Sequence, residues 1–472
     1  MNDPDLSRLI LAYEDILSLE GEDLVVLDAG RLRDEAIDSL VREAVFGETD
    51  GRKQAARWII RQAGSSLGIH PASIHEYYLT RGKGSCPGAT TPAINVRSLA
   101  YDTSRAIFRS AQKLQVGALI FEIARSEIGY THQRPAEYAA VITAAAIAEG
   151  FQGPVFIQGD HFQVNAKKYA ADPETELGNL RDLIREALAA GFYNLDLDSS
   201  TLVDLSHDTI EAQQETNARV AAELTAFVRQ HEPEGVTVSV GGEIGEVGKQ
   251  NSTPEELRAF MSQYESAREA LGVEPGLSKI SIQTGTSHGG VVLPDGSLQE
   301  VAIDFDCLDQ LGQLARDDYE MGGAVQHGAS TLPAECFDRF SQADAVEVHL
   351  ATNFQNILLD HPEFPEELRE EITSWLDTHM GSERKEGQTD EQFHYSLRKK
   401  ALGPFKRKIW DLPASTRSAI CSDLEKNFSM LFEKLGVTNT REDVIASTSI
   451  VEIHPSLVAA TVIAEDDTSL DD

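Results

Sequence analysis

The chain has 472 residues, 41% of them hydrophobic, which suffices for a large core, and no apolar run approaches the ~20 residues that a membrane span requires. Its formal net charge of -36, from 77 acidic residues against 41 Lys and Arg, repels the phosphate backbone of nucleic acids. We therefore expect no membrane insertion and no nucleic-acid partner, and a phosphorylated substrate would need local positive charge or backbone donors.

Residues 1–85 have the apolar spacing of amphipathic helices. Leu6, Leu9 and Ile10 recur at helical intervals. The Gly-rich segment 81–88, Arg-Gly-Lys-Gly-Ser-Cys-Pro-Gly, interrupts this pattern. We predict a helical N-terminal extension over residues 1–85.

Residues 86–360 alternate short apolar runs with amphipathic helices, which is typical of parallel βα units. The helices are long enough for right-handed crossovers, so the repeat closes into a (β/α)8 TIM barrel. An open doubly wound sheet is the alternative, but its G-x-G-x-x-G loop behind the first strand is absent. We predict eight strands, at about residues 93–96, 117–123, 154–159, 192–198, 236–241, 279–283, 323–326 and 344–350.

Residues 361–472 are charged and helical again, so we predict a helical C-terminal extension with an acidic tail. A cationic cluster stands out in this acidic chain. It either pairs with acids on the barrel or on a neighbouring subunit, or it helps to bind an anionic substrate. Its members are Arg398, Lys399, Lys400, Lys406, Arg407 and Lys408.

The four cysteines have neither metal-ligand nor disulfide-framework spacing, which favours a reducing compartment. The first residues lack the basic start and apolar core of a secretory signal. We therefore expect a cytoplasmic protein, and we expect a homo-oligomer.

Three histidines follow three of the predicted strands: His161, His288 and His327. The carboxyl ends of barrel strands form one mouth, where three ligands and an open position are the arrangement of a catalytic zinc. Such an ion polarises a carbonyl group. We predict that these histidines bind one divalent metal, with Zn²⁺ favoured.

Acidic residues occur at the same strand ends. Asp160 precedes His161 and can turn toward a substrate as a proton acceptor. Asp198 and Glu243 end the fourth and fifth strands, where each would orient a histidine ligand or bind the metal itself. Asp196, two residues before Asp198, is expected to form an ion pair inside the barrel.

Strands seven and eight end in His327-Gly-Ala-Ser-Thr and His349-Leu-Ala-Thr-Asn. Barrels commonly bind phosphate here through amides, hydroxyls and a helix N-terminus, so Ser330 and Thr352 are candidate phosphate ligands. Both hydroxyls could equally cap a helix. Neither motif contains Lys or Arg, so a second phosphate would need a cationic patch, for which we consider Arg398, Lys399 and Lys400.

Between residues 92 and 360 the chain resembles the class II, metal-dependent ketose-bisphosphate aldolases. Five segments carry the resemblance, and they occur in the family's order. They are Gly159-Asp-His161, Gly191-Phe through Asp198-Ser-Ser, Gly242-Glu-Ile-Gly-Glu-Val-Gly, Gly285-Thr-Ser-His288-Gly and His327-Gly-Ala-Ser330.

The resemblance implies cleavage of fructose 1,6-bisphosphate between C3 and C4 to dihydroxyacetone phosphate and glyceraldehyde 3-phosphate, with tagatose bisphosphate as the alternative substrate. The family metal, usually zinc, would lie on the three histidines, and Asp160 would take the C4 hydroxyl proton. The ketone-side phosphate would bind at Gly289, Gly328, Ser330 and Thr352, often beside a monovalent cation.

The chain departs from the family pattern in three places. In the His327 motif, Ala329 and Thr331 replace glycines of the family's His-Gly-Gly-Ser-Gly. His349 stands where the family's eighth-strand motif has a substrate-contacting Asn. The usual acid for the enediolate proton is missing after the fifth strand, where the next acids are Glu255 and Glu256. A non-catalytic aldolase-like subunit and another barrel metalloenzyme, such as an epimerase or a hydrolase, therefore remain open. In that last case Asp160 and Asp198 would be base and ligand.

Overall fold

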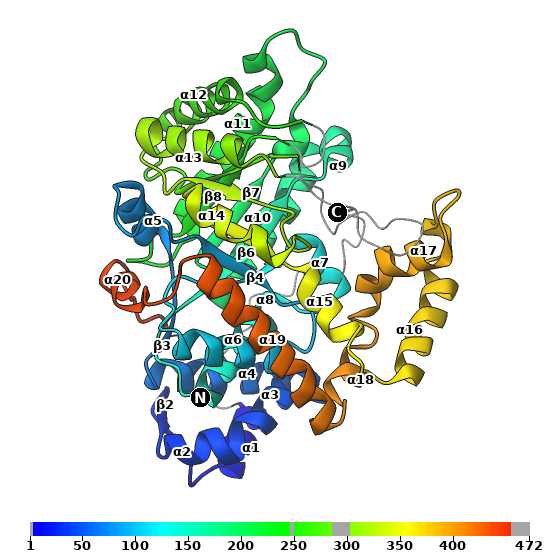
Figure 1. Ribbon diagram of the computed structural model, residues 1–472. Coiled ribbons are helices and arrows are strands. Elements are labelled where there is room, and N and C mark those ends of the chain that lie inside the picture. Colours follow the sequence, from blue (N-terminus) through cyan, green and yellow to red (C-terminus); the bar gives the residue numbers. More distant parts are fainter. Residues whose placement is uncertain (1–2, 246–249, 286–302, 455–472) are drawn as a thin grey trace.

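The computed structural model describes residues 3–245, 250–285 and 303–454. Within these ranges, parallel strands β4 to β11 follow one another around a ring, and β11 pairs with β4 to close it. The predicted (β/α)8 barrel is therefore confirmed (Figure 1). Its strands are β4 (Thr91–Asn95), β5 (Ile120–Ala124), β6 (Gly153–Gln163), β7 (Asn194–Asp198), β8 (Ser239–Glu243), β9 (Lys279–Ile282), β10 (Ala324–Gln326) and β11 (Glu347–Leu350).

Helices cover the outside of the barrel, so both faces of its sheet are buried, as parallel sheets require. None of the helices in the described ranges combines the length and the apolar composition that a membrane span needs. The covering helices are α6 (Ala100–Lys113), α7 (Arg125–Tyr130), α8 (Pro135–Ala148), α9 (Ala166–Ala171), α10 (Pro173–Ala190), α11 (Ile210–His231), α12 (Pro254–Ala270), α13 (Phe305–Tyr319), α14 (Asp338–Gln342) and α15 (Thr352–Leu359).

Local sequence signals fix where these helices begin and end. Helix α10 begins where the Asp172 side chain accepts the Thr175 N–H, has Pro173 in its first turn and ends at Gly191, whose φ is +94°. Helix α12 begins with a capping box, in which Thr253 and Glu256 bond each other's backbone N–H groups. Such caps set the residues at which the crossover helices begin and end.

The N-terminal extension consists of helices together with three short strands. Strands β1 (Leu17–Glu20) and β2 (Asp23–Val26) form a hairpin. Strand β3 (Ile69–Ala72) joins the central sheet, parallel to the first half of β6. Four-residue strands are too short to show an apolar period, so the helical prediction did not include them. The helices are α1 (Pro4–Ala12), α2 (Ala29–Arg31), α3 (Ile37–Phe46), α4 (Asp50–Ser66) and α5 (His75–Gly82), with a π-helical turn over Leu32–Ala36.

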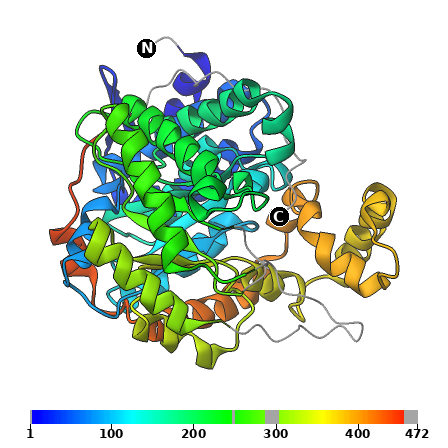
Figure 2. The same ribbon diagram turned by 90° about the horizontal axis from the view of Figure 1, so that it is seen from above.

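The C-terminal extension begins with an arm, α16 (Glu366–His379) and α17 (Asp390–Leu397), that projects from one side of the barrel (Figures 1 and 2). The chain then continues through α18 (Lys406–Trp410), α19 (Ala414–Lys434) and α20 (Arg441–Ala446). Helix α19 packs on α6, where Arg109 forms an ion pair with Glu425 at 2.8 Å. Trp410 meets Phe46 of the N-terminal extension, with ring centroids 5.3 Å apart. Both extensions are thus joined to the barrel and to each other.

Candidate active site

Asp160 and His161 are adjacent in sequence, yet both enter the barrel mouth. In a regular strand successive side chains point to opposite faces. Here Gly159 pairs with Leu195 and Phe162 with Leu197, so β6 carries one residue more than β7 over this stretch, which is a β-bulge. His161 occupies the bulge with φ of +39°, a backbone conformation that non-glycine residues seldom adopt. The bulge is what lets one strand deliver an acid and an imidazole together.

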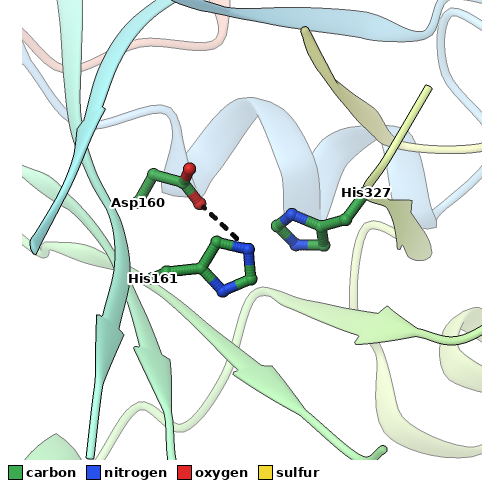
Figure 3. A group of neighbouring side chains, drawn as sticks. All are labelled: Asp160, His161 and His327. Carbon is green, nitrogen blue, oxygen red and sulfur yellow. Dashed lines mark ion pairs between the residues drawn. The ribbon is translucent and has the colours of Figure 1, made fainter. Parts of the chain in front are cut away.

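Asp160, His161 and His327 lie with their ligand atoms within 4.8 Å of one another and turn toward a common point (Figure 3). His161 Nε2 is 3.9 Å from Asp160 Oδ1. The ring centroids of His161 and His327 are 4.3 Å apart. Ser281 Oγ lies 3.0 Å from His327 Nε2. Nitrogen and carboxylate donors of this kind suit a divalent transition metal. His288 and Gly289, also predicted for this site, lie outside the described residues.

Asp198 and Glu243 lie against the other nitrogen of His161. Its Nδ1 is 3.1 Å from Asp198 Oδ2 and 3.6 Å from Glu243 Oε2. Burial works against the charged forms, but the contact with Asp160 and the hydrogen bond to Asp198 raise the pKa of His161 well above its ordinary value. Burial raises the pKa of Glu243, and the charge of Asp198 adds to this effect. The two carboxylates are placed either to orient His161 or to hold a metal ion together with it, so both of the roles that we expected stay open.

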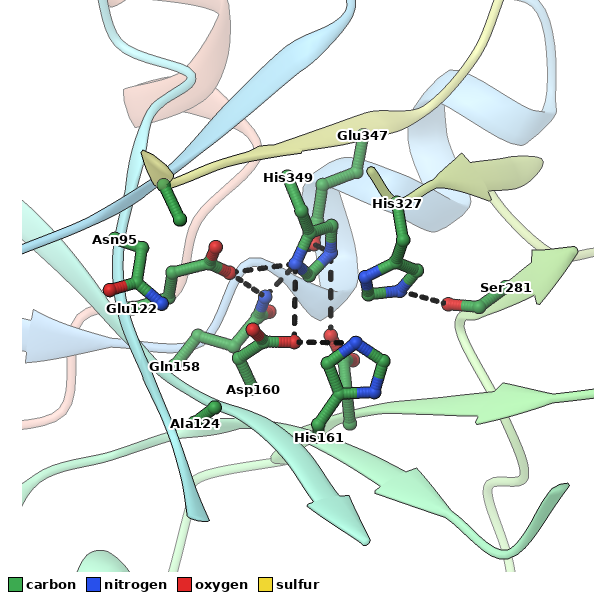
Figure 4. A network of polar contacts seen from close by, with 12 residues as sticks. Asn95, Glu122, Ala124, Gln158, Asp160, His161, Ser281, His327, Glu347 and His349 are labelled. Atoms are coloured by element: carbon green, nitrogen blue, oxygen red, sulfur yellow. Dashed lines mark hydrogen bonds and ion pairs between the residues drawn. The ribbon is translucent and has the colours of Figure 1, made fainter. Parts of the chain in front are cut away.

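His349 occupies the middle of the barrel, between carboxylates on both sides (Figure 4). Its Nδ1 is 2.8 Å from Glu122 Oε2 and 3.3 Å from Asp160 Oδ1, and its Nε2 is 2.7 Å from Glu347 Oε1. The centroid of its ring is also 4.0 Å from the centroid of the His327 ring. His349 is therefore part of the same cluster, beside the candidate base Asp160, and it lines the same cavity as Ser330 and Thr352.

Lys279 holds the deeper layer of the barrel together. Its Nζ is 2.6 Å from Glu347 Oε1 and 2.9 Å from Asp196 Oδ1, so the ion pair expected of Asp196 is confirmed. It also donates to Gln158 Oε1 at 2.7 Å. Burial alone would lower the pKa of Lys279, but Asp196 and Glu347 more than offset this and raise it. Tyr78, from α5 of the N-terminal extension, donates a short hydrogen bond to Glu347.

Buried acids outnumber the fixed cations in this lumen. Burial, together with the charge of Asp160, raises the pKa of Glu122 to about 8. Burial likewise raises the pKa of Asp196 to about 6, despite Lys279. These buried acids, next to two histidines with converging nitrogens, fit a bound metal cation, which would favour their ionised forms. The buried acids are Glu122, Asp160, Asp196, Asp198, Glu243 and Glu347.

A cavity of about 550 Å³ opens above this cluster. Gly328, Ser330 and Thr352 line one side, where Ser330 Oγ accepts the Ala351 N–H at 2.6 Å and so joins the loops after β10 and β11. The arm lines the other side. Its contributions include Lys385, Gln388, Gln392, Tyr395 and Lys399. A larger hollow of about 820 Å³, between α6 and α19, contains none of the strand-end residues.

Of the three cluster residues that we considered for a second phosphate, Lys399 lines this cavity. Arg398 and Lys400 are not among the described residues that line it. Arg398 pairs with Asp360 at 2.6 Å, and Lys400 Nζ lies 5.6 Å from the centre of the Tyr130 ring. The rest of the cluster mostly meets acids of the chain itself, as Lys406 does with Glu137 and Lys408 with Glu371.

Glu122, Lys279 and Lys385 belong to the site or support it, and the sequence analysis missed them. The sequence does contain an indication for Glu122 and Lys279, because each is the single charged residue of an apolar strand. Charged residues are almost never fully buried unless they are paired, so each position predicts a buried ion pair. The sequence contains no such indication for Lys385, since this residue follows the barrel strands in a polar segment. Glu256, one of the acids after the fifth strand, is used in the α12 cap.

Replacing His327 by Ala should remove the metal from its position beside His161. The loss of one of few nitrogen donors weakens a site of this kind strongly, whereas the fold should survive because the ring faces the open cavity. Metal analysis after dialysis, with circular dichroism for folding, checks this. A His327→Ala protein that keeps the wild-type metal content at every position would contradict the assignment.

Comparisons with known proteins agree with the barrel fold. A solved structure described as a probable tagatose 6-phosphate kinase from Sinorhizobium meliloti is similar, with TM-score 0.51 and 16% identity over 76% of this chain and all of that one. The fructose-bisphosphate aldolase of Campylobacter jejuni has TM-score 0.48 and 15% identity, over 79% of this chain and 96% of that one. No curated protein sequence matches the chain. The family model for fructose-bisphosphate aldolase class II matches residues 87–396, well over half of the chain. The chain therefore belongs to the class II fructose-bisphosphate aldolase family.

Proposed function

We propose that the chain is a metal-dependent aldolase that cleaves a ketose bisphosphate, with fructose 1,6-bisphosphate as the first candidate and tagatose bisphosphate as the alternative. Family membership supports a lyase. The observation that carries the proposal is the convergence of Asp160, His161 and His327 at the base of a cavity that also holds hydroxyl and cationic groups.

His161 and His327 would hold the metal, for which we propose Zn²⁺, together with His288 as the predicted third ligand. When bound, the metal polarises the ketone carbonyl and so favours charge on the adjacent carbon. Asp198 and Glu243 fix the ring of His161 through its other nitrogen. The two histidines that would hold the ion both line the cavity.

Asp160 is placed to accept the C4 hydroxyl proton. Loss of that proton lets the C4 oxygen form the aldehyde while the C3–C4 bond breaks and its electron pair stays on C3. Protonation of C3 then completes dihydroxyacetone phosphate, and glyceraldehyde 3-phosphate is the other product. Because Asp160 also touches His349, the acid is held within the cluster and does not swing freely.

The two ends of the cavity suit two phosphates. We propose that Gly328, Ser330 and Thr352 bind the ketone-side phosphate, beside a monovalent cation, through amides and hydroxyls. Lys385 and Lys399 of the arm then supply the counter-charge for the other phosphate. In this way the C-terminal extension would complete the substrate site.

The test is to incubate the protein with fructose 1,6-bisphosphate and, separately, with tagatose 1,6-bisphosphate, and to detect triose phosphate with a coupled dehydrogenase. We expect product that disappears after a chelator and returns when Zn²⁺ is added. Failure of the fully metal-loaded protein to cleave either sugar would favour the non-catalytic interpretation.

Replacing Lys399 by Gln should raise KM for the bisphosphate by roughly 10-fold, as expected when one charge-assisted contact is lost, with a smaller effect on kcat. Lys385→Gln should act in the same direction. Lys408→Gln is the matched control, because Lys408 pairs with Glu371 and is not among the described residues that line the cavity. Wild-type KM and salt dependence in both arm variants would assign the arm a purely structural role.

We also propose that the protein is a cytoplasmic homo-oligomer that binds phosphorylated ketoses and triose phosphates. The scattered free cysteines agree with a reducing compartment. Analytical ultracentrifugation of the full chain would establish its oligomeric state.

A further inference from the structure

We propose that the hollow between α6 and α19 binds a phosphorylated sugar, at a site separate from the catalytic cavity. The two helices lie side by side on the outside of the barrel (Figure 1). The hollow measures about 820 Å³ against about 550 Å³ for the catalytic cavity, and the two share none of their described lining residues. Pockets for small metabolites have volumes in this range. The proposal does not depend on which reaction the barrel catalyses.

Basic side chains predominate along the hollow, in contrast to the chain as a whole. Five basic and three acidic side chains line it, whereas the chain carries 41 Lys and Arg against 77 acidic residues. The basic ones are Arg105, Arg109, Lys113, Arg417 and Lys426, and the acidic ones are Asp102, Glu425 and Glu433. A concave surface with an excess of one sign attracts ligands of the opposite sign, so the hollow favours an anion.

Carboxylates hold two of these arginines in place without using all of their donors. Arg109 Nε is 2.8 Å from Glu425 Oε2, and its Nη1 is 3.0 Å from Glu149 Oε1. Arg417 Nη1 is 3.0 Å from Asp102 Oδ2. Within the described ranges neither Nη2 group donates a hydrogen bond, and the two side chains are 35% and 30% exposed. A guanidinium oriented by a carboxylate on one edge loses little further freedom when a phosphate meets its other edge.

Further donors surround these arginines. Lys113, at the end of α6, is exposed and forms no ion pair with any residue that the structure describes. Along α19, Ser418, Ser422 and Ser429 line the hollow. Ammonium, guanidinium and hydroxyl groups all donate to phosphate oxygens. No aromatic ring is among the described lining residues, so a nucleobase would find nothing to stack on, which favours a sugar phosphate over a nucleotide.

Helix α19 connects the hollow to a candidate phosphate ligand of the catalytic cavity. Met430 lines the hollow and also a smaller cavity of about 160 Å³, which Asn427 and Ser330 line as well. That cavity leaves α19 room to shift, and among the described residues Asn427 Oδ1 has no hydrogen-bond partner that would resist the shift. Helix α6 in turn follows β4, whose last residue, Asn95, lines the catalytic cavity. A ligand that draws α6 and α19 together would therefore act on the catalytic cavity from two sides.

The experiment measures binding of glucose 6-phosphate, an aldose phosphate, to the full-length, metal-loaded protein by equilibrium dialysis. We expect binding that weakens as salt is added, because the contacts are between charges near the surface. Lys113→Gln and Arg109→Gln should each raise Kd by roughly 10-fold, as expected when one charge-assisted contact is lost. Arg185→Gln is the matched control: Arg185, on α10, is 48% exposed and pairs with Asp182, so its loss should leave Kd unchanged.

The Lys113→Gln protein keeps the test valid if Arg109→Gln does not fold, because Lys113 is exposed and has no ion pair to lose. A wild-type protein that does not bind glucose 6-phosphate would overturn the proposal. Binding that Lys399→Gln weakens and the two hollow variants leave unchanged would also overturn it, because the sugar would then occupy the catalytic cavity.

Amide hydrogen exchange locates the bound sugar independently. Glucose 6-phosphate should slow exchange in α19, and exchange there that stays the same on binding would contradict the assignment. Neither dialysis nor hydrogen exchange requires turnover, so a failure of the proposed aldolase activity is distinguishable from a failure of this site.

Discussion

Replacing Asp160 by Asn is expected to lower kcat by about 10²- to 10⁴-fold, the range for loss of a general base, while His161 and His327 keep their ion. The amide has nearly the shape of the carboxylate but cannot accept the C4 hydroxyl proton. Asp160 is 5% exposed and touches both His161 and His349, so its geometry is fixed by neighbours that the variant retains. Steady-state cleavage of fructose 1,6-bisphosphate with metal analysis of the same sample measures both effects.

The matched control is Asp423→Asn, which changes a half-exposed aspartate on α19 and should leave kcat unaltered. If Asp160→Asn retained full kcat with its metal bound, Asp160 would not be the base. Glu122 would then be the next acid to examine, because it lines the same cavity and also contacts His349.

The sequence predicted the barrel because its signals are local and repeated. Each buried strand is an apolar run, and each crossover is an amphipathic helix with a cap, as at Asp172 and Thr253. The strand-end position of His161 and His327 followed from the same pattern, since parallel strands finish at one mouth. Asp196 could be assigned to an ion pair because it shares a strand face with Asp198.

Other features of the site depend on contacts between distant residues, which no local pattern records. The bulge at His161 shows only in the pairing of β6 with β7, so the sequence could not indicate that Asp160 and His161 face the same way. Lys385 reaches the cavity only because the segment between the two arm helices lies beside the barrel mouth. The position of His349 beside Glu122 arises from the closure of the ring.

Replacing Lys279 by Met is expected to lower the free energy of unfolding by about 3–5 kcal/mol, the cost of leaving buried charges without their partner. Lys279 is fully buried and contacts both Glu347 and Asp196. The surrounding fold is built for this lysine, because a Cβ at Gly241 would overlap Asp196 and lie 2.9 Å from Lys279 Cε. Urea unfolding of the metal-free protein, followed by circular dichroism, measures the change.

A second substitution tests whether the loss comes from charge or from packing. Lys279→Met combined with Glu347→Gln removes one of the stranded carboxylates, so the double variant should be more stable than Lys279→Met alone. Lys426→Met is the surface control: Lys426 is 75% exposed and pairs with Asp423 at 2.8 Å, so its loss should change stability by less than about 1 kcal/mol. A double variant no more stable than Lys279→Met would mean that the lysine stabilises the barrel by filling space, and that the acids of the lumen are neutralised by protons.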